Sequence, residues 1–90
     1  MNQTAMEEIV HDQKRRRFQT SVEGHTAYVE YDIHDGMLDI LHTVVPPPVE
    51  GLGIASSLVR HVFDYALRHG LKPEATCSYA RTWLARHPEY

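Results

Sequence analysis

Two side chains in this 90-residue chain have types suited to acyl or proton transfer, and they flank a glycine-spaced turn. Cys77 is the only cysteine, and a thiolate is a strong nucleophile where exposure and a lowered pKa favour it. A lone cysteine is more often a small buried apolar residue, so both interpretations stay open. His42 is one of seven histidines and is either a general base or a structural histidine within a strand.

The turn between them runs from Val44 to Ser57, where an apolar segment ends at three prolines and a long amphipathic pattern follows. Gly51 and Gly53 lack a Cβ, so the backbone there can turn sharply and approach a ligand. The first N–H groups of the next helix have no intrahelical partner and lie at the positive end of its dipole. This arrangement is typical of a phosphate site, and its alternative is a plain β-to-α connection.

Other charged and metal-binding residue types give weaker signals. His61 and His69 lie two turns apart on one predicted helix, a spacing that does not favour zinc, so we expect no metal site. The basic run Lys14 to Arg17 has two interpretations: a solvated entry to a strand, or an attraction for an anionic ligand.

Composition limits the class of protein. The net charge of −3 argues against a nucleic-acid-binding protein, which usually has a basic face. No apolar run is long enough to span a bilayer, and the N-terminus lacks the apolar core of a signal peptide. One cysteine allows no internal disulfide, so we expect a cytoplasmic location. We also expect a monomer that does not act at a membrane.

The elements that position these residues follow from periodicity. Residues 1–13 are polar and aperiodic, and we expect a flexible tail with at most one weak strand at its end. Residues 14–90 form a single domain. Alternation of apolar and polar residues predicts strands over Phe18–Val22 and Ala27–Ile33.

A hairpin fixes the predicted register of the third strand. Asp35-Gly36 favours a two-residue loop that pairs His34 with Met37. Continued without interruption, this register places His42 opposite Val29, on the apolar face of the sheet.

The second half of the chain alternates helix and strand. Apolar residues at helical spacing predict a helix over about Gly53–His69, followed by a strand within Pro73–Ser78 and a helix over Tyr79–His87. The predicted fold is α+β: an antiparallel β-meander followed by helix, strand and helix (β-β-β-α-β-α), with the last strand parallel to the third. The glycine turn then lies at the carboxyl end of the third strand, where ligands bind in open α/β sheets.

Together these motifs resemble a known family. The segment from Val44-Val45-Pro46-Pro47 through Glu50-Gly51-Leu52-Gly53-Ile54-Ala55-Ser56-Ser57 is similar to the acetyl-CoA-binding segment of the GCN5-related N-acetyltransferases (GNAT), especially their very small single-domain members. His42-Thr43 before the turn, Cys77-Ser78-Tyr79 and the C-terminal His87-Pro88-Glu89-Tyr90 support the resemblance, which covers about residues 17–90.

The resemblance implies a truncated GNAT-like fold that binds acetyl-CoA or CoA. It implies that the backbone N–H groups of Glu50 to Ala55 hold the pyrophosphate. It also implies that the edge of the third strand at Val44-Val45 hydrogen-bonds the pantetheine arm, where that strand splays from the one carrying Cys77. The implied cofactor-binding residues are Val44, Val45, Glu50, Gly51, Leu52, Gly53, Ile54, Ala55 and Ser56.

The resemblance also implies a reaction. Cys77 takes the acetyl group as a thioester, with His42 as base, and an unknown small-molecule or protein amine is the acceptor. In this family Gln or Arg commonly stands where this chain has Glu50. The alternatives are a non-catalytic module that binds CoA or acyl-CoA, and a structural domain without affinity for CoA.

Overall fold

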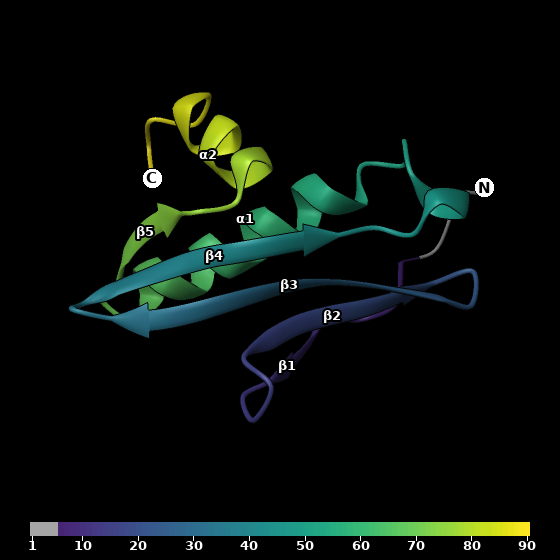
Figure 1. Cartoon of the computed structure of the whole chain (residues 1–90), viewed down its shortest axis with the longest axis horizontal. Coiled ribbons are helices and arrows are strands. Elements are labelled where there is room, and N and C mark those ends of the chain that lie inside the picture. Colours follow the sequence, from purple (N-terminus) through teal and green to yellow (C-terminus); the bar gives the residue numbers. More distant parts are fainter. Residues whose placement is uncertain (1–5) are drawn as a thin grey trace.

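Alternating apolar residues build a five-stranded sheet with the strand order β1-β2-β3-β4-β5 (Figure 1). The computed structural model describes residues 6–90. All neighbouring strands are antiparallel except β4 and β5, which are parallel. The strands are β1 (Val10–Asp12), β2 (Arg17–Val22), β3 (His25–His34), β4 (Met37–Val44) and β5 (Lys72–Ala75). The α+β fold and the antiparallel meander are therefore confirmed.

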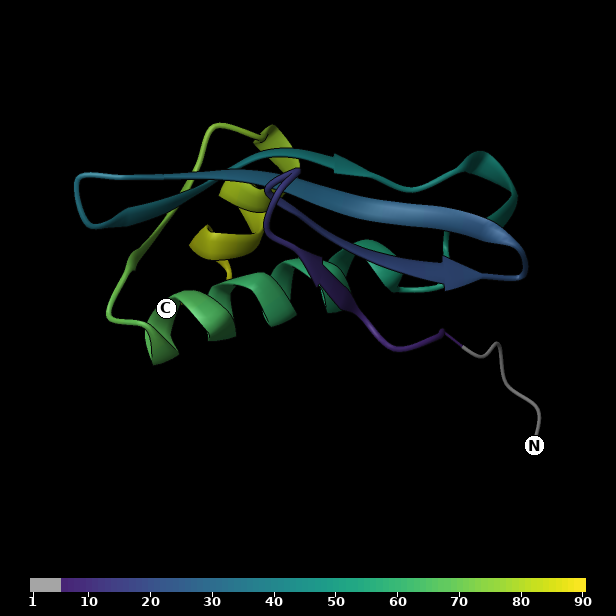
Figure 2. The same cartoon turned by 90° about the horizontal axis from the view of Figure 1, so that it is seen from below.

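Two helices cover one face of this sheet (Figure 2). Helix α1 (Ile54–Arg68) follows a short 3-10 turn at Pro47–Val49, and helix α2 (Ser78–Ala85) follows β5. The boundaries of α1 agree with the predicted helix to within one residue, because Gly53 and His69 are its two caps. The helices and the inner face of the sheet enclose one core, which includes Phe18, Val29, Leu38, Ile40, Leu58, Val59, Val62, Phe63 and Trp83.

The sheet includes residues that the sequence assigned to a flexible tail. Strand β1 pairs His11 with Phe18, and Met6 forms a further bridge to Val22. The weak strand expected at the end of the tail is thus present, and the sheet begins before residue 14. Its signal in the sequence is faint because the inward-facing residue of β1 is a histidine, which stacks on Phe18 with ring centroids 3.9 Å apart. The first five residues of the predicted tail lie outside the described part of the chain.

The register of the β3–β4 hairpin is confirmed near the turn and wrong beyond it. His34 pairs with Met37 and Tyr31 with Ile40, as the Asp-Gly turn predicts. The register then shifts between Glu30 and Tyr31, so that Glu30 faces His42. An extra residue in β4 forms this β-bulge, and a one-residue shift moves every later side chain to the opposite face.

Candidate functional site

The two parallel strands separate where the candidate site lies. Strand β4 pairs with β5 only as far as Ile40 and Ala75. The carbonyl of Ile40 then accepts from the N–H groups of both Thr76 and Cys77, at 3.0 Å each. Beyond this point β4 continues to Val44, while the segment that follows β5 turns away into α2. The result is a wedge-shaped opening between the end of β4 and the start of α2.

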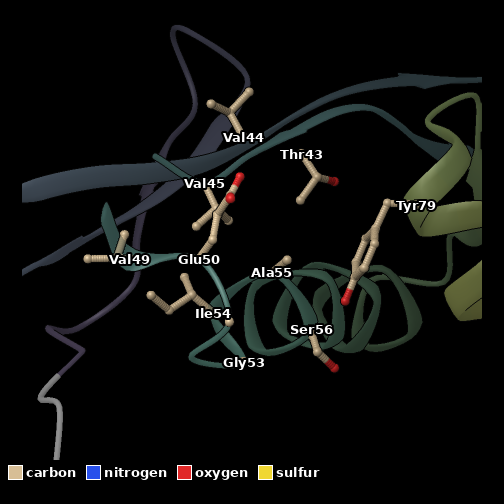
Figure 3. Close-up of a pocket in the computed structure, with 11 residues that line it drawn as sticks. Thr43, Val44, Val45, Val49, Glu50, Gly53, Ile54, Ala55, Ser56 and Tyr79 are labelled. Atoms are coloured by element: carbon tan, nitrogen blue, oxygen red, sulfur yellow. The ribbon is translucent and has the colours of Figure 1, made fainter. Parts of the chain in front are cut away.

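A cavity of about 560 Å³ occupies this opening (Figure 3). It reaches from the end of β4 across the glycine turn to the first turns of both helices. The residues that line it are Thr43, Val44, Val45, Val49, Glu50, Gly51, Gly53, Ile54, Ala55, Ser56 and Tyr79. Of the predicted cofactor-binding residues, only Leu52 is not part of this lining, and its side chain is about half exposed.

The glycine turn presents unpartnered backbone N–H groups to the cavity. Gly51 and Gly53 have φ values of +83° and +81°, a conformation that costs other L-residues roughly 1–2 kcal/mol. Gly53 is the N-cap of α1 and has no side chain to cap the helix. Within residues 6–90, no protein group accepts from the N–H groups of residues 51–56. The N–H of Glu50 instead donates to the Pro47 carbonyl at 3.2 Å, so Glu50 does not belong to the set of free amides.

Cys77 lies at the base of the same opening. It is the N-cap residue of α2 and is partly buried. Its Sγ is 3.5 Å from Thr43 Oγ1, which links the thiol to the cavity wall. Burial raises the pKa of the Cys77 thiol, but hydrogen bonds from Thr43 and from the backbone of Ala80 and Tyr79 outweigh burial, so the pKa is lowered overall. A thiolate is therefore favoured here more than in a free cysteine.

The β-bulge keeps His42 away from this thiol. The expectation that His42 lies on the apolar face is wrong, because the shifted register places His42 opposite Glu30 and leaves it exposed. Thr43, opposite Val29, takes the inward position instead. Sequence reasoning missed Thr43 because a two-residue alternation cannot reveal an extra residue. The adjacent apolar pair Ile40-Leu41 is the one local hint of a break in alternation.

Tyr79 is a second residue of the site that is absent from the predicted catalytic and cofactor-binding residues. Its side chain is 42% exposed and lines the cavity. Its hydroxyl points toward the first turn of α1 in Figure 3. The inward positions of α2 are Ala80 and Trp83.

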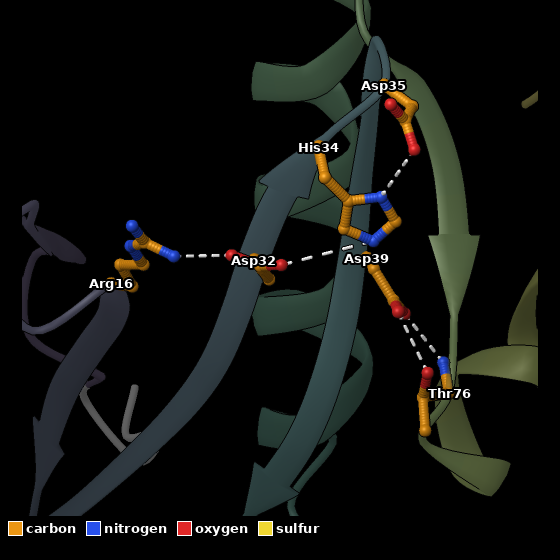
Figure 4. Close-up of polar contacts among 6 residues, drawn as sticks. All are labelled: Arg16, Asp32, His34, Asp35, Asp39 and Thr76. Carbon is orange, nitrogen blue, oxygen red and sulfur yellow. Dashed lines mark hydrogen bonds and ion pairs between the residues drawn. The ribbon is translucent and has the colours of Figure 1, made fainter.

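A set of hydrogen bonds holds the residue that precedes Cys77. Asp39 accepts from the backbone N–H of Thr76 at 2.7 Å and from its hydroxyl at 2.8 Å (Figure 4). The guanidinium of Arg81 donates to the Thr76 carbonyl at 2.8 Å. All three polar groups of Thr76 are thus satisfied, which fixes the turn from β5 into α2 and so the position of the thiol.

The other sequence signals do not extend the site. The arginines of the basic run lie near carboxylates: Arg15 with Asp12, Arg16 with Asp32 and Arg17 with Glu30. These contacts fit a solvated strand entry better than a ligand site. Among residues 6–90, no cluster of three metal-ligating side chains could hold a metal ion. Neither described helix is long and apolar enough to cross a membrane.

Comparison with known proteins agrees with this geometry. Residues 17–90 match the family described as GCN5-related N-acetyl-transferase. The chain is similar to the protein NATD1 of Gallus gallus, with 31% identity over 84 residues that cover 90% of this chain and 76% of that protein. The NATD1 protein of Homo sapiens is 30% identical over 83 residues, which cover 89% of this chain and 74% of the human protein. The chain is a small member of the GCN5-related N-acetyltransferase family.

Proposed function

We propose that this protein is an acetyltransferase that binds acetyl-CoA and passes its acetyl group to an amine of a small molecule or protein. The observation that carries the proposal is that one cavity joins two features. Residues 51 and 53–56, whose amides are unpartnered, line one end, and Thr43, which contacts the Cys77 thiol, lines the other. An anion at the amides and a thioester near Cys77 are therefore within one continuous space.

The amides suit the pyrophosphate of the cofactor. Backbone N–H groups at a helix N-terminus bind phosphate without a cationic side chain, since the helix dipole adds to their partial charges. Both glycines keep the turn free of side chains that would block a close approach. In this proposal Glu50 lines the cavity wall, and its N–H does not bind the pyrophosphate.

The end of β4 suits the pantetheine arm. This arm carries amide groups. Val44 and Val45 lie where β4 has separated from β5, and no strand within residues 6–90 pairs with that edge. Backbone groups on an open strand edge can bond an extended ligand as they would a further strand. An arm laid along this edge from the turn reaches Thr43 and, next to it, Cys77.

Transfer through Cys77 proceeds in two balanced steps. In the first, the Cys77 thiolate attacks the acetyl carbonyl, a new S–C bond forms, and the S–C bond to CoA breaks, so that CoA leaves as a thiolate and is protonated. In the second, the acceptor amine attacks the Cys77 thioester, Cys77 leaves as a thiolate, and the amine loses a proton to water. Similar basicity of the two thiols makes the first step chemically easy.

Mass spectrometry of the intact protein after incubation with acetyl-CoA tests the proposal. We expect a mass gain of one acetyl group, located on Cys77 by peptide mapping and absent in Cys77→Ala. A folded Cys77→Ala protein that still acetylates amines at the wild-type rate would show that transfer is direct.

A non-catalytic module that binds CoA is the second candidate. One observation favours it: within residues 6–90 the hydrogen-bond partners of the Cys77 thiol are the Thr43 hydroxyl and backbone groups, and none of them is the side chain of a histidine, aspartate or glutamate. His42, the base that the resemblance implies, is exposed on the opposite face. Saturable binding of CoA without transfer to any amine or thiol would support the module.

A further inference from the structure

A second, smaller cavity adjoins the first between the start of α1 and the exposed side of α2. Its volume is about 190 Å³, and it shares Ser56 and Tyr79 with the large cavity. The remaining lining residues are Thr82, Trp83, Arg86 and His87. Because Ser56 belongs both to the first-turn amides and to this wall, a ligand held at those amides lies next to the smaller cavity.

The wall of the smaller cavity is rigidly built. The indole Nε1 of Trp83 donates to Ser56 Oγ at 3.0 Å. The His87 ring stacks on Trp83 with centroids 3.7 Å apart and planes within 14°. His87 Nδ1 lies 2.7 Å from the Trp83 carbonyl, and since a carbonyl only accepts, Nδ1 carries the proton. The other ring nitrogen, Nε2, is then left for a different partner.

Charge distinguishes the two cavities. Among the described residues that line the large cavity, Glu50 is the one charged side chain, and it is acidic. The smaller cavity has the Arg86 guanidinium and the His87 imidazole, and within residues 6–90 Arg86 forms no ion pair. A ligand with a second phosphate group, besides the one at the amides, would find a cationic partner in Arg86 on the α2 side.

We propose that the smaller cavity binds the 3′-phosphate and ribose of the cofactor's nucleotide, with Arg86 as the charge partner of that phosphate. The proposal rests on the proposed binding of CoA. It adds that α2 recognises the nucleotide end of the cofactor, which the proposed function does not specify. A phosphomonoester accepts well from a planar guanidinium, which donates two parallel hydrogen bonds. Arg86 thus determines preference for CoA over an analogue that lacks the 3′-phosphate.

Calorimetric titration with CoA and with dephospho-CoA tests this assignment. We expect the wild-type protein to bind CoA roughly three- to tenfold more tightly. In Arg86→Gln the affinity for CoA should fall to that for dephospho-CoA, while the affinity for dephospho-CoA stays unchanged. Arg86→Lys should retain part of the preference for CoA. Arg68→Gln, which removes the same charge at the far end of α1, is the matched control and should retain the wild-type ratio.

Three results would overturn the assignment while leaving CoA binding intact: equal wild-type affinities, an Arg86→Gln loss that is the same for both ligands, or an equal loss of preference in Arg68→Gln. Failure of the wild-type protein to bind either ligand would overturn the proposed function, and this assignment with it.

Discussion

The contact between Thr43 and Cys77 joins the end of β4 to the start of α2, two segments that lie far apart in the sequence. The position of Cys77 after the last strand could be predicted from the pattern of elements, because a strand that follows a crossover helix returns parallel to its neighbour. Its partner could not be predicted, since that depends on which face each residue of β4 presents. The structure surrounds the thiol with the Thr43 hydroxyl and with backbone groups of Thr43, Tyr79 and Ala80 rather than with an imidazole.

Replacing this hydroxyl should change the chemistry of the thiol more than the stability of the fold. Thr43→Val keeps the shape and removes the hydrogen bond that lowers the pKa of Cys77. We expect the pH profile of Cys77 alkylation by iodoacetamide to shift to higher pH. Thr26→Val, on the exposed part of β3, is the control and should leave the profile in place. A profile that is the same in Thr43→Val and in the wild type would contradict this account of the thiol.

At the scale of elements, the helices and the hairpin turn were predictable and the β-bulge was not. Gly53 and Gly70 mark the ends of α1 in the sequence because their φ values of +81° and +70° suit glycine. The bulge, where Leu41 of β4 is the extra residue opposite the step between Glu30 and Tyr31, contains no glycine or proline that would mark it in the sequence. Because of this one extra residue, Thr43 lies in the site where an uninterrupted register would place His42.

The turn between β5 and α2 depends on Asp39, which accepts two hydrogen bonds from Thr76. Asp39→Ala removes both, and we expect a loss of about 1–3 kcal/mol in the free energy of unfolding together with slower alkylation of Cys77. Asp39→Asn still offers one acceptor to the Thr76 N–H and should lose less than half as much. Urea denaturation measures the first effect and alkylation kinetics the second. An Asp39→Ala protein as stable as the wild type would show that these bonds do not hold the turn.

For the whole molecule, a cluster of aromatic and histidine rings joins the N-terminal strand to the sheet and α1. His11 hydrogen-bonds the Tyr31 hydroxyl, stacks on Phe18 and forms a T-shaped contact with Tyr65, with ring centroids 4.8 Å apart. Burial lowers the pKa of His11, and the nearby His61 and His69 add to this against an opposing effect of Asp12. Burial also lowers the pKa of His61, and Arg68 lowers it further.

Two histidines with lowered pKa values make stability depend on pH. Between the pKa of an unfolded histidine, about 6.5, and the lower folded value, the unfolded chain binds more protons, so stability falls as pH falls. We expect the free energy of unfolding to decrease from pH 7.5 to pH 5.5, and to decrease less in His61→Asn. Ser57→Ala, on the same helix, should keep the wild-type slope. Urea denaturation across this range measures the effect, and stability that rises toward pH 5.5 would contradict the buried-histidine account.

The most direct test of the site is a titration of isotope-labelled protein with CoA, followed by the amide resonances in NMR spectra. If the free N–H groups hold the pyrophosphate and the end of β4 holds the pantetheine arm, the largest saturable shifts belong to residues 51–56 and 43–45. Smaller shifts at Cys77 and Tyr79 would follow as the sulfur end of the ligand arrives. Saturable binding that leaves the amides of residues 51–56 unshifted would contradict the site described for this cavity.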